Sequence, residues 1–376
     1  MKILFLSHYS GLLGSNRSLD SIITYFTQKG INISILLPSK GEFYNYLRAK
    51  GMDVHSFMFI YETLYVKKNK KYFTLPILWL YNIVAFPFLL WKIRKLNPDV
   101  IYTNSSSDLY SVFLSKILRK KHVMHVREFM QEDFGGYCIL GRNVKREIIL
   151  KSDKLVFVSH AVANAVVGEI PQYGRIIYNG LPTPLKNYDY HDIDEKFRIG
   201  VVANIDISKQ QDLAIKMMPD ILKKYPKVTL HLIGDKDCPY KRYLKELVKQ
   251  LELESKVIFE GFVKDTEEIY SKFDILLMCS RSEAFGRVTI ESMLRYKPVI
   301  GYEAGGTPEL IKDGITGFKF KTEADVIRAL NIIINDSEKT KKIVYNAHKE
   351  ASEEFAEKVY TNKVYDFIIN EKWREY

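Results

Sequence analysis

Short apolar runs rich in branched residues alternate along the chain with longer stretches of helical periodicity. The first half contains six such runs and, after an interruption, the second half contains six more: Ile3–Leu6, Ile33–Leu37, Val100–Thr103, Val123–Val126, Leu155–Ser159 and Ile176–Tyr178, then Ile199–Val202, Thr229–Ile233, Val257–Phe259, Ile275–Cys279, Val299–Tyr302 and Gly317–Phe320. Helical stretches of about ten residues or more separate most of them. Because strands that alternate with helices pair in parallel, the pattern predicts two parallel sheets with helices on both faces.

The segment between the two halves, Leu181–Asp192, is rich in proline and polar residues and breaks the alternation. We interpret it as a linker. The length of 376 residues also exceeds that of one typical domain, so we expect two Rossmann-like α/β domains, residues 1–182 and 183–354. Ligands are expected at the carboxyl ends of the strands, in the cleft between the domains. No GxGxxG follows either first strand and no GxxxxGK[ST] occurs, so dinucleotide oxidoreductases and P-loop proteins lose their main support.

Positive charge is concentrated in the first half. Residues 1–182 contain 24 basic and 12 acidic side chains, whereas the remainder contains 32 and 33. This asymmetry indicates an anionic partner, which could be a nucleic acid or the anionic headgroups of a membrane. The alternative is a solvated lysine-rich surface without such a partner. Because no RNP, KH or helix-turn-helix signature occurs, we do not expect a nucleic acid.

A run of 19 residues without a formal charge, Phe73–Trp91, lies between two basic clusters. The clusters contain Lys67, Lys68, Lys70 and Lys71 on one side and Lys92, Arg94 and Lys95 on the other. The run has the length of a membrane span, but Pro76, Asn82 and Pro87 interrupt it and both of its ends are basic. We favour a helix on an anionic membrane surface, because tryptophans suit the interface, over a buried core helix or a true span.

The cysteines of the chain indicate a reducing compartment. The segment Met1–His8 is too short for a signal-peptide core and is expected to form the first strand. The three cysteines, Cys138, Cys238 and Cys279, are too widely spaced for a disulfide framework or a CxxC metal site. His122 and His125 lie three apart on a predicted strand and so face opposite sides, which makes a metal pair unexpected.

The densest group of chemistry-bearing residues is Ser280–Met293, directly after the apolar strand Ile275–Cys279. A strand that leads into a glycine-containing loop and a helix presents backbone N–H groups at the edge of the sheet, which suits a phosphate. Glu283 is expected in the loop and Glu291 in the helix. On one continuous helix they would lie about 12 Å apart, more than the roughly 5 Å of a retaining glycosidase pair. The two carboxylates are therefore expected to serve different parts of one extended ligand.

Glu283 and Glu291 form an E-x7-E pattern, and three motifs follow it in order: Pro298-Val-Ile, Gly305-Gly306-Thr-Pro-Glu309-Leu-Ile and Asp313-Gly314-Ile-Thr-Gly317-Phe. Together they closely resemble the C-terminal domain of family 4 (group 1) retaining glycosyltransferases of the GT-B fold. The first half resembles the same family through Gly14-Ser-Asn-Arg17-Ser-Leu, Pro98-Asp99-Val-Ile-Tyr-Thr-Asn104, His125-Val-Arg127-Glu128, Val158-Ser159 and Tyr178-Asn179-Gly180. The resemblance implies that residues 355–376 carry a last helix, about Phe355–Asn370, that crosses back onto the N-terminal domain.

The resemblance also implies roles for single residues. Glu283 would hydrogen-bond hydroxyls of the donor sugar, and Glu291 would hold the ribose hydroxyls of the nucleotide. Lys209 would neutralise the diphosphate leaving group. Gly14 matches a loop glycine that lets the backbone approach that diphosphate.

In the loop between Glu283 and the helix of Glu291, the resemblance implies further donor contacts from Phe285 and Gly286. Asn204 stands where the family often has an arginine shortly before the lysine. We expect Arg287, the residue after the loop, to supply the missing positive charge.

The motif at the end of the fourth predicted strand implies a catalytic residue as well. His125 matches a histidine near the reacting sugar, and the alternative is a purely structural role. For Arg127 and Glu128, which follow it, the alternative to a role in the site is an ion pair with each other.

From this resemblance we expect a cytoplasmic enzyme at the inner face of the membrane, moving a sugar from a UDP- or GDP-sugar to an acceptor hydroxyl with retained anomeric configuration. The expected acceptor is a glycan or a lipid-linked glycan, used for bacterial surface polysaccharide. Neither a cofactor nor a metal is expected, because Lys209 and its neighbours would carry the positive charge. The alternatives are a GT-B nucleotide-sugar 2-epimerase, which consumes no acceptor, and a non-catalytic GT-B binding subunit.

Overall fold

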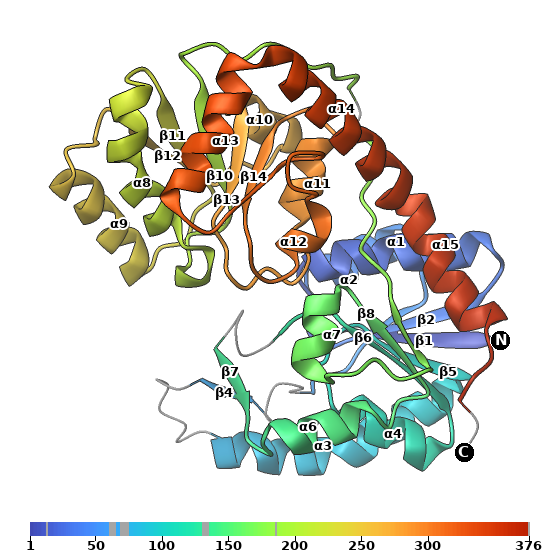
Figure 1. Cartoon of the computed structure of the whole chain (residues 1–376). Coiled ribbons are helices and arrows are strands. Elements are labelled where there is room, and N and C mark those ends of the chain that lie inside the picture. Colours follow the sequence, from blue (N-terminus) through green and yellow to red (C-terminus); the bar gives the residue numbers. More distant parts are fainter. Residues whose placement is uncertain (13, 60–64, 68–74, 130–134, 185, 375–376) are drawn as a thin grey trace. The chain divides into compact units, whose positions relative to one another are not determined.

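The computed structural model describes residues 1–12, 14–59, 65–67, 75–129, 135–184 and 186–374 (Figure 1). The chain divides into two compact units, which we call unit 1 (Met1–Gly180 with Glu357–Tyr376) and unit 2 (Leu181–Ala356). The boundaries between the units lie two residues from the expected ends of residues 1–182 and 183–354. Residues 68–74, which include three lysines of the first basic cluster, lie outside the described residues.

Unit 1 is built on a seven-stranded parallel sheet with the order β3-β2-β1-β5-β6-β8-β9. Its strands are β1 (Lys2–Leu6), β2 (Asn32–Leu37), β3 (Val54–Ser56), β5 (Val100–Thr103), β6 (Lys121–Val126), β8 (Lys154–Phe157) and β9 (Gly174–Ile176). A separate antiparallel pair is formed by β4 (Tyr65–Lys67) and β7 (Gly136–Cys138). Each predicted strand of this half overlaps a strand of the structure, although β9 begins two residues earlier than predicted.

The helices of unit 1 cover both faces of this sheet. They are α1 (Gly14–Gln28), α2 (Glu42–Ala49), α3 (Leu75–Leu96), α4 (Tyr110–Leu118), α6 (Arg142–Ile149), α7 (His160–Val166) and α15 (Glu357–Tyr365). Alternate residues of β1 face opposite ways, as the pleat requires. Ile3 and Phe5 join a core with α1 and α15, whereas Leu4 and Leu6 join a core with α3 and α4.

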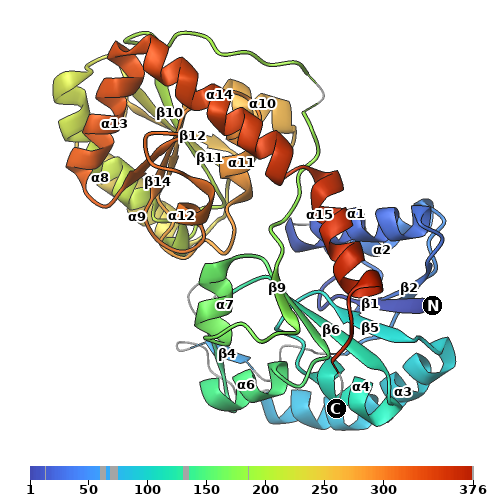
Figure 2. The ribbon, with the colours of Figure 1, turned by 45° about the vertical axis from the view of Figure 1, so that its right-hand side comes forward.

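The C-terminal segment returns to unit 1, as the resemblance implied. Helix α15 lies along α1 in Figures 1 and 2, and side chains of the two helices are hydrogen-bonded, among them Tyr25 with Asn362. A π-helical turn, Asp366–Asn370, follows α15. The buried Lys154 amine donates to the carbonyls of Phe367 and Glu371, where a cation opposes the negative end of the helix.

Helix α3 contains most of the predicted apolar run and continues through Pro87. One stripe of it, with Ala85, Leu89 and Ile93, is buried against the sheet. Among the described residues, Pro76–Leu96 is one helix long and apolar enough to cross a membrane by length and composition, and 22% of that window is buried. The helix is therefore anchored to the sheet along one side, and the buried-core alternative fits only that side.

Unit 2 is built on a six-stranded parallel sheet with the order β12-β11-β10-β13-β14-β15. Its strands are β10 (Arg198–Val202), β11 (Thr229–Ile233), β12 (Val257–Gly261), β13 (Ile275–Met278), β14 (Val299–Tyr302) and β15 (Phe318–Phe320). Its helices are α8 (Gln211–Lys224), α9 (Pro239–Gln250), α10 (Thr266–Ser271), α11 (Arg287–Met293), α12 (Thr307–Leu310), α13 (Glu323–Asn335) and α14 (Ser337–Glu354). Two parallel sheets with helices on their faces confirm the predicted fold class.

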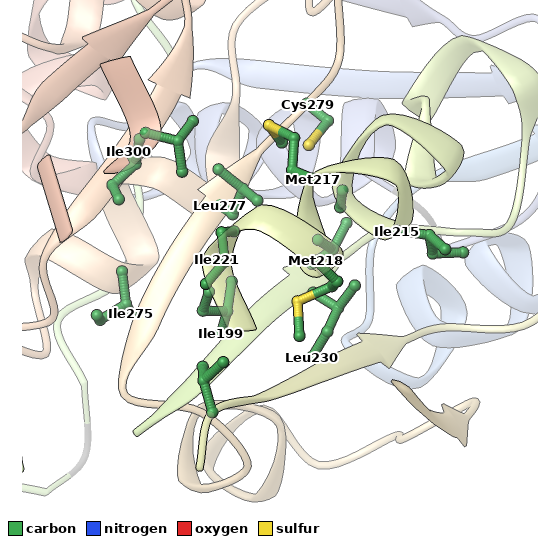
Figure 3. Close-up of a cluster of buried hydrophobic side chains, with 14 of the residues drawn as sticks. Ile199, Ile215, Met217, Met218, Ile221, Leu230, Ile275, Leu277, Cys279 and Ile300 are labelled. Carbon is green, nitrogen blue, oxygen red and sulfur yellow. The ribbon is translucent and has the colours of Figure 1, made fainter. Parts of the chain in front are cut away.

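A hydrophobic core of unit 2 lies between its sheet and helices that include α8 (Figure 3). Met218 and Ile221 of α8 belong to it together with Ile199 of β10 and Leu277 of β13. This packing fixes β10 and β13 as neighbours. In the sheet order, β10 lies between β11 and β13, so the direction of winding reverses beside it. In open α/β sheets this reversal point is where ligands bind, at the carboxyl ends of the strands.

Candidate active site

A cavity of about 130 Å³ opens at the carboxyl ends of β10 and β13. Its walls are the last residues of both strands, the start of α11, and the side chains of Lys209 and Glu283. A pocket for a whole drug-sized ligand measures about 300–1,000 Å³, so this cavity holds a part of such a ligand. The sheet therefore brings two of the predicted catalytic residues to one cavity at the winding reversal.

Lys209 and Glu283 form an ion pair, with 2.7 Å between Lys209 Nζ and Glu283 Oε2. Their side chains are 30% and 19% exposed, so both remain accessible to a ligand. Lys209 ends a short 3₁₀ turn, Ile207–Lys209, that the Asp206 side chain caps by accepting from the Ser208 N–H. The capped turn thus fixes the backbone position of Lys209. In this structure Glu283 neutralises the charge of the Lys209 amine.

Two glycines hold the loop that carries Glu283. The Gly306 N–H donates to the Glu283 carbonyl over 2.6 Å, and Gly305 has a φ of +61°. A Cβ on Gly305 would lie 2.7 Å from the Glu283 carbonyl oxygen, closer than real Cβ atoms come. The Gly305-Gly306 pair therefore forms a turn and also holds the backbone of Glu283 in place.

Replacing Gly305 with alanine is expected to slow any reaction that uses Glu283 by about tenfold or more, because the loop must move away from the new Cβ. The left-handed backbone adds a stability cost of roughly 1–2 kcal/mol. Gly314→Ala is the matched control, since Gly314 has a φ of +70° and no atom within 4 Å of a built Cβ. Thermal melts check that both variants are folded. Equal activity of the two folded variants would show that the Gly305 contact does not position Glu283.

Glu291 lies in α11 and has a second set of partners. The Tyr270 hydroxyl donates to Glu291 Oε2 over 2.7 Å, and Arg287 Nη2 lies 3.6 Å from Glu291 Oε1. Burial and the glutamate charge raise the pKa of Tyr270, which keeps the phenol a donor. The carboxylate is 22% exposed and retains acceptor capacity beyond these contacts. Tyr270 carries no motif, and only the fold brings it to this carboxylate.

The other predicted donor residues are found in unequal settings. Asn204 is exposed in the loop after β10, where its carbonyl accepts from the Gln211 side chain. Gly286, with a φ of +94°, precedes the first residue of α11, Arg287. The Phe285 ring is buried against Phe355, so this side chain packs in the core instead of lining the cavity.

Unit 1 holds the remaining predicted residues. Gly14 is the exposed first residue of α1, which follows β1. His125 is fully buried, and its Nδ1 is hydrogen-bonded to the Tyr102 hydroxyl. Burial and the nearby Arg127 charge hold the pKa of His125 well below its usual value, so the ring is neutral. This placement fits the structural alternative for His125, and its role near the reacting sugar stays a prediction.

Arg127 and Glu128 do not pair with each other among the described residues, which corrects that alternative. The Arg127 guanidinium donates to Asn104, Asn179 and Tyr360, which come from three separate parts of unit 1. Glu128 Oε1 accepts from the backbone N–H of Ser106 and from the hydroxyls of two serines that follow β5. A fixed polar network thus lies at the carboxyl ends of β5 and β6.

Two family models match the chain, and between them they cover most of it. The model described as glycosyltransferase family 4 matches residues 14–184, and the model described as glycosyl transferases group 1 matches residues 189–350. An uncharacterized 41.2 kDa protein in the cps region of Klebsiella pneumoniae is 32% identical over 69% of this chain and 74% of its own length. The chain belongs to the group 1 glycosyltransferases.

Two further similarities concern this glycosyltransferase over nearly its whole length. The sulfoquinovosyl transferase SQD2 of Arabidopsis thaliana is 22% identical over 95% of this chain and 71% of its own length. The Anabaena protein Alr3699/HepE, crystallised with UDP, is 24% identical, with a TM-score of 0.80 over 99% of this chain and 100% of its own. The structural similarity shows that this glycosyltransferase has the GT-B fold.

Proposed function

We propose that this glycosyltransferase moves a sugar from a nucleotide-diphosphate sugar to an acceptor hydroxyl. The observation that carries the proposal is the Lys209–Glu283 pair, a cation and a carboxylate 2.7 Å apart that line one cavity at the winding reversal of unit 2. A diphosphate needs the cation, and a sugar hydroxyl needs the acceptor oxygens. The similar Anabaena protein, which has also been crystallised with UDP-glucose, supports this class of donor.

Donor binding would exchange the partners of this pair. The diphosphate takes the Lys209 amine from Glu283, and the released carboxylate accepts hydrogen bonds from the donor sugar. As the bond to the sugar breaks, negative charge grows on the diphosphate, and a lysine that is already in place stabilises it without further reorganisation. Lys209 therefore acts on the leaving group, whereas Glu283 orients the sugar.

Glu291 is proposed to hold the ribose. Tyr270 fixes one carboxylate oxygen, and the acceptor positions that remain can bind two neighbouring hydroxyls. Glu291 and Glu283 have different partners within unit 2, which supports the proposal that the two carboxylates act on different parts of one ligand.

We propose retention of the anomeric configuration, with the acceptor attacking from the side on which the diphosphate leaves. The departing phosphate would receive the proton of the acceptor hydroxyl. The positive charge needed on the diphosphate would come from Lys209 and Arg287, without a metal or a cofactor.

Attachment at the inner face of the membrane, with a lipid-linked acceptor for a surface polysaccharide, completes the proposal. Unit 1 would attach to the membrane. Most of unit 1 lies within residues 1–182, which contain 24 basic and 12 acidic side chains, and unit 1 also contains α3. Away from the anchoring stripe of α3, Ile83 and Phe88 are 69% and 61% exposed. Such an apolar, exposed helix beside basic residues suits the membrane interface.

A donor panel tests this function. Purified protein is heated with UDP-, GDP- and ADP-sugars, and the donor that raises the melting temperature is then incubated with a bacterial lipid extract in excess EDTA. NMR of the product is expected to show a retained anomeric configuration. An isomerised nucleotide sugar without a glycosylated product would favour the 2-epimerase, and the absence of a thermal shift with every donor would contradict the proposal.

Arg287→Ala is expected to weaken binding of the nucleoside diphosphate by about 1.5–3 kcal/mol, the range for a hydrogen bond to a charged group. The reason is that Arg287 supplies the charge missing at Asn204, so Asn204→Arg in the same protein should restore part of the loss. Calorimetry measures both. Arg328→Ala is the matched control, because Arg328 also pairs with a carboxylate of its own helix, at 3.1 Å. Unchanged affinity in Arg287→Ala would show that Arg287 does not supply this charge and that another cation must do so.

A further inference from the structure

Helix α3 presents a continuous apolar stripe on the side away from the sheet. Ile77, Leu80, Val84, Phe88 and Trp91 are between 59% and 67% exposed, and they follow one another at spacings of three or four residues. Residues with this spacing lie along one side of a helix. Isolated exposed apolar residues are common, but an apolar stripe along a whole helix indicates an interaction surface.

Helix α4 extends this apolar surface. Its Leu114 shares a buried cluster with Leu89 of α3, so both helices cover the same face of the sheet. Phe113 and Ile117, one turn apart on α4, are 39% and 56% exposed. Buried and exposed apolar residues follow one another along α4, as in Val112, Phe113 and Leu114.

A third group of exposed apolar residues lies on the segment from β7 to α6. Tyr137, Leu140 and Val144 are 40%, 41% and 47% exposed. Figures 1 and 2 show α6 with α3 and α4 along the same side of unit 1. The three groups therefore belong to one side of the unit.

Basic side chains accompany all three groups. Arg94 and Lys95 lie in the last turn of α3, Arg119 directly follows α4, and Arg142 and Arg146 lie on α6. The Lys95 amine lies 5.4 Å from the centre of the Trp91 ring, as in interfacial anchors. An apolar surface surrounded by cations is complementary to an anionic bilayer and not to a neutral or basic protein surface.

The topology also sets the direction of α3. A helix that crosses between parallel strands runs back from the carboxyl edge of the sheet to the amino edge. The first turns of α3, with Ile77 and Leu80, therefore lie toward the carboxyl edge, where β6 also ends before β7. A bilayer on this side lies next to the edge at which α/β sheets bind their ligands.

We propose that α3, α4 and the β7–α6 segment form one docking face for an anionic lipid bilayer, so that attachment is not a property of α3 alone. The inference rests on the proposed membrane attachment and adds to it the extent of the face. A lipid-linked acceptor would reach the carboxyl edge of unit 1 from this face.

The test is co-sedimentation with vesicles of phosphatidylglycerol and phosphatidylcholine, compared with phosphatidylcholine alone, at low and high salt. The wild type is expected to bind the anionic vesicles in a salt-sensitive manner. The double variant Phe113→Ser/Ile117→Gln and the double variant Leu140→Gln/Val144→Gln should each lower the partition coefficient by about tenfold or more. The altered side chains are exposed, and thermal melts check that the variants are folded.

The matched control is Ile207→Gln/Ile315→Gln in unit 2, where the two side chains are 73% and 53% exposed and binding should not change. If only Phe88→Ser/Trp91→Ser reduced binding, attachment by α3 would stand and the three-part face would be wrong. If the wild type bound neither vesicle, membrane attachment itself would fail. A concentration-dependent dimer that the α4 variant abolishes would instead assign the face to a second copy of the chain.

Discussion

Replacing Lys209 with alanine is expected to slow sugar transfer by about two orders of magnitude, which corresponds to roughly 3 kcal/mol of transition-state stabilisation. The lysine is the cation at the cavity that meets the negative charge of the departing diphosphate. Binding of the free nucleoside diphosphate should weaken as well, by roughly 10- to 150-fold, because a charged hydrogen bond contributes about 1.5–3 kcal/mol. A steady-state assay measures the first effect and calorimetry the second.

Lys216→Ala is the matched control for this substitution. Lys216 pairs with Asp212 at 2.7 Å on the surface of α8, so the variant also removes a lysine from a 2.7 Å ion pair, but away from the cavity. Its transfer rate and its affinity should equal those of the wild type. A folded Lys209→Ala protein that behaved like this control would remove Lys209 from the mechanism.

Replacing Glu283 is expected to have effects of opposite sign on transfer and on nucleotide binding. Glu283→Ala should slow transfer by about two orders of magnitude, since the sugar loses the group that orients it. Glu283→Gln should nevertheless bind the free nucleoside diphosphate up to about fivefold more tightly than the wild type. The carboxylate competes with the diphosphate for Lys209, and a partly exposed ion pair contributes about 0.2–1 kcal/mol.

Glu350→Gln serves as the control, because Glu350 forms a 2.7 Å ion pair with Lys312 outside the cavity. Its affinity for the nucleoside diphosphate should stay at the wild-type value. Weaker binding in Glu283→Gln would show that Glu283 contacts the nucleotide itself, and the exchange of partners at Lys209 would be wrong.

Much of the fold follows from the local pattern of the sequence. The apolar runs mark β1, β5 and β10 because strands buried on both faces contain little else. The three-residue strands β3, β4 and β7 were not predicted, since runs such as Val54-His55-Ser56 have neither length nor alternation. They are strands because a neighbouring strand offers them hydrogen-bond partners.

The exposed side of α3 could not be read from the sequence for a related reason. The helix is apolar nearly all round, so periodicity does not say which stripe is buried. Packing on the sheet determines which stripe is buried. Leu89 and Ile93 join the buried cluster of Leu4 and Leu6, whereas Trp91 stays exposed.

The candidate site was predictable as a set of residues and not as a set of contacts. The E-x7-E spacing identifies Glu283 and Glu291, but Lys209 lies 74 residues from its partner Glu283. Tyr270, the partner of Glu291, belongs to no motif. For His125 the motif was visible and its burial was not, since burial depends on Tyr102 and Tyr360 around it.

The central claim is that this glycosyltransferase breaks the bond between a sugar and a nucleoside diphosphate with Lys209 at the leaving group. The most direct measurement is the rate of nucleoside-diphosphate release from UDP-, GDP- and ADP-sugars, with a bacterial lipid extract as acceptor, for the wild type and Lys209→Ala. Release by the wild type from one class of donor, in equal amount to labelled sugar in the product and about a hundredfold faster than in the variant, is the expected result. Equal rates in the two proteins, or no release from any donor, would contradict the claim.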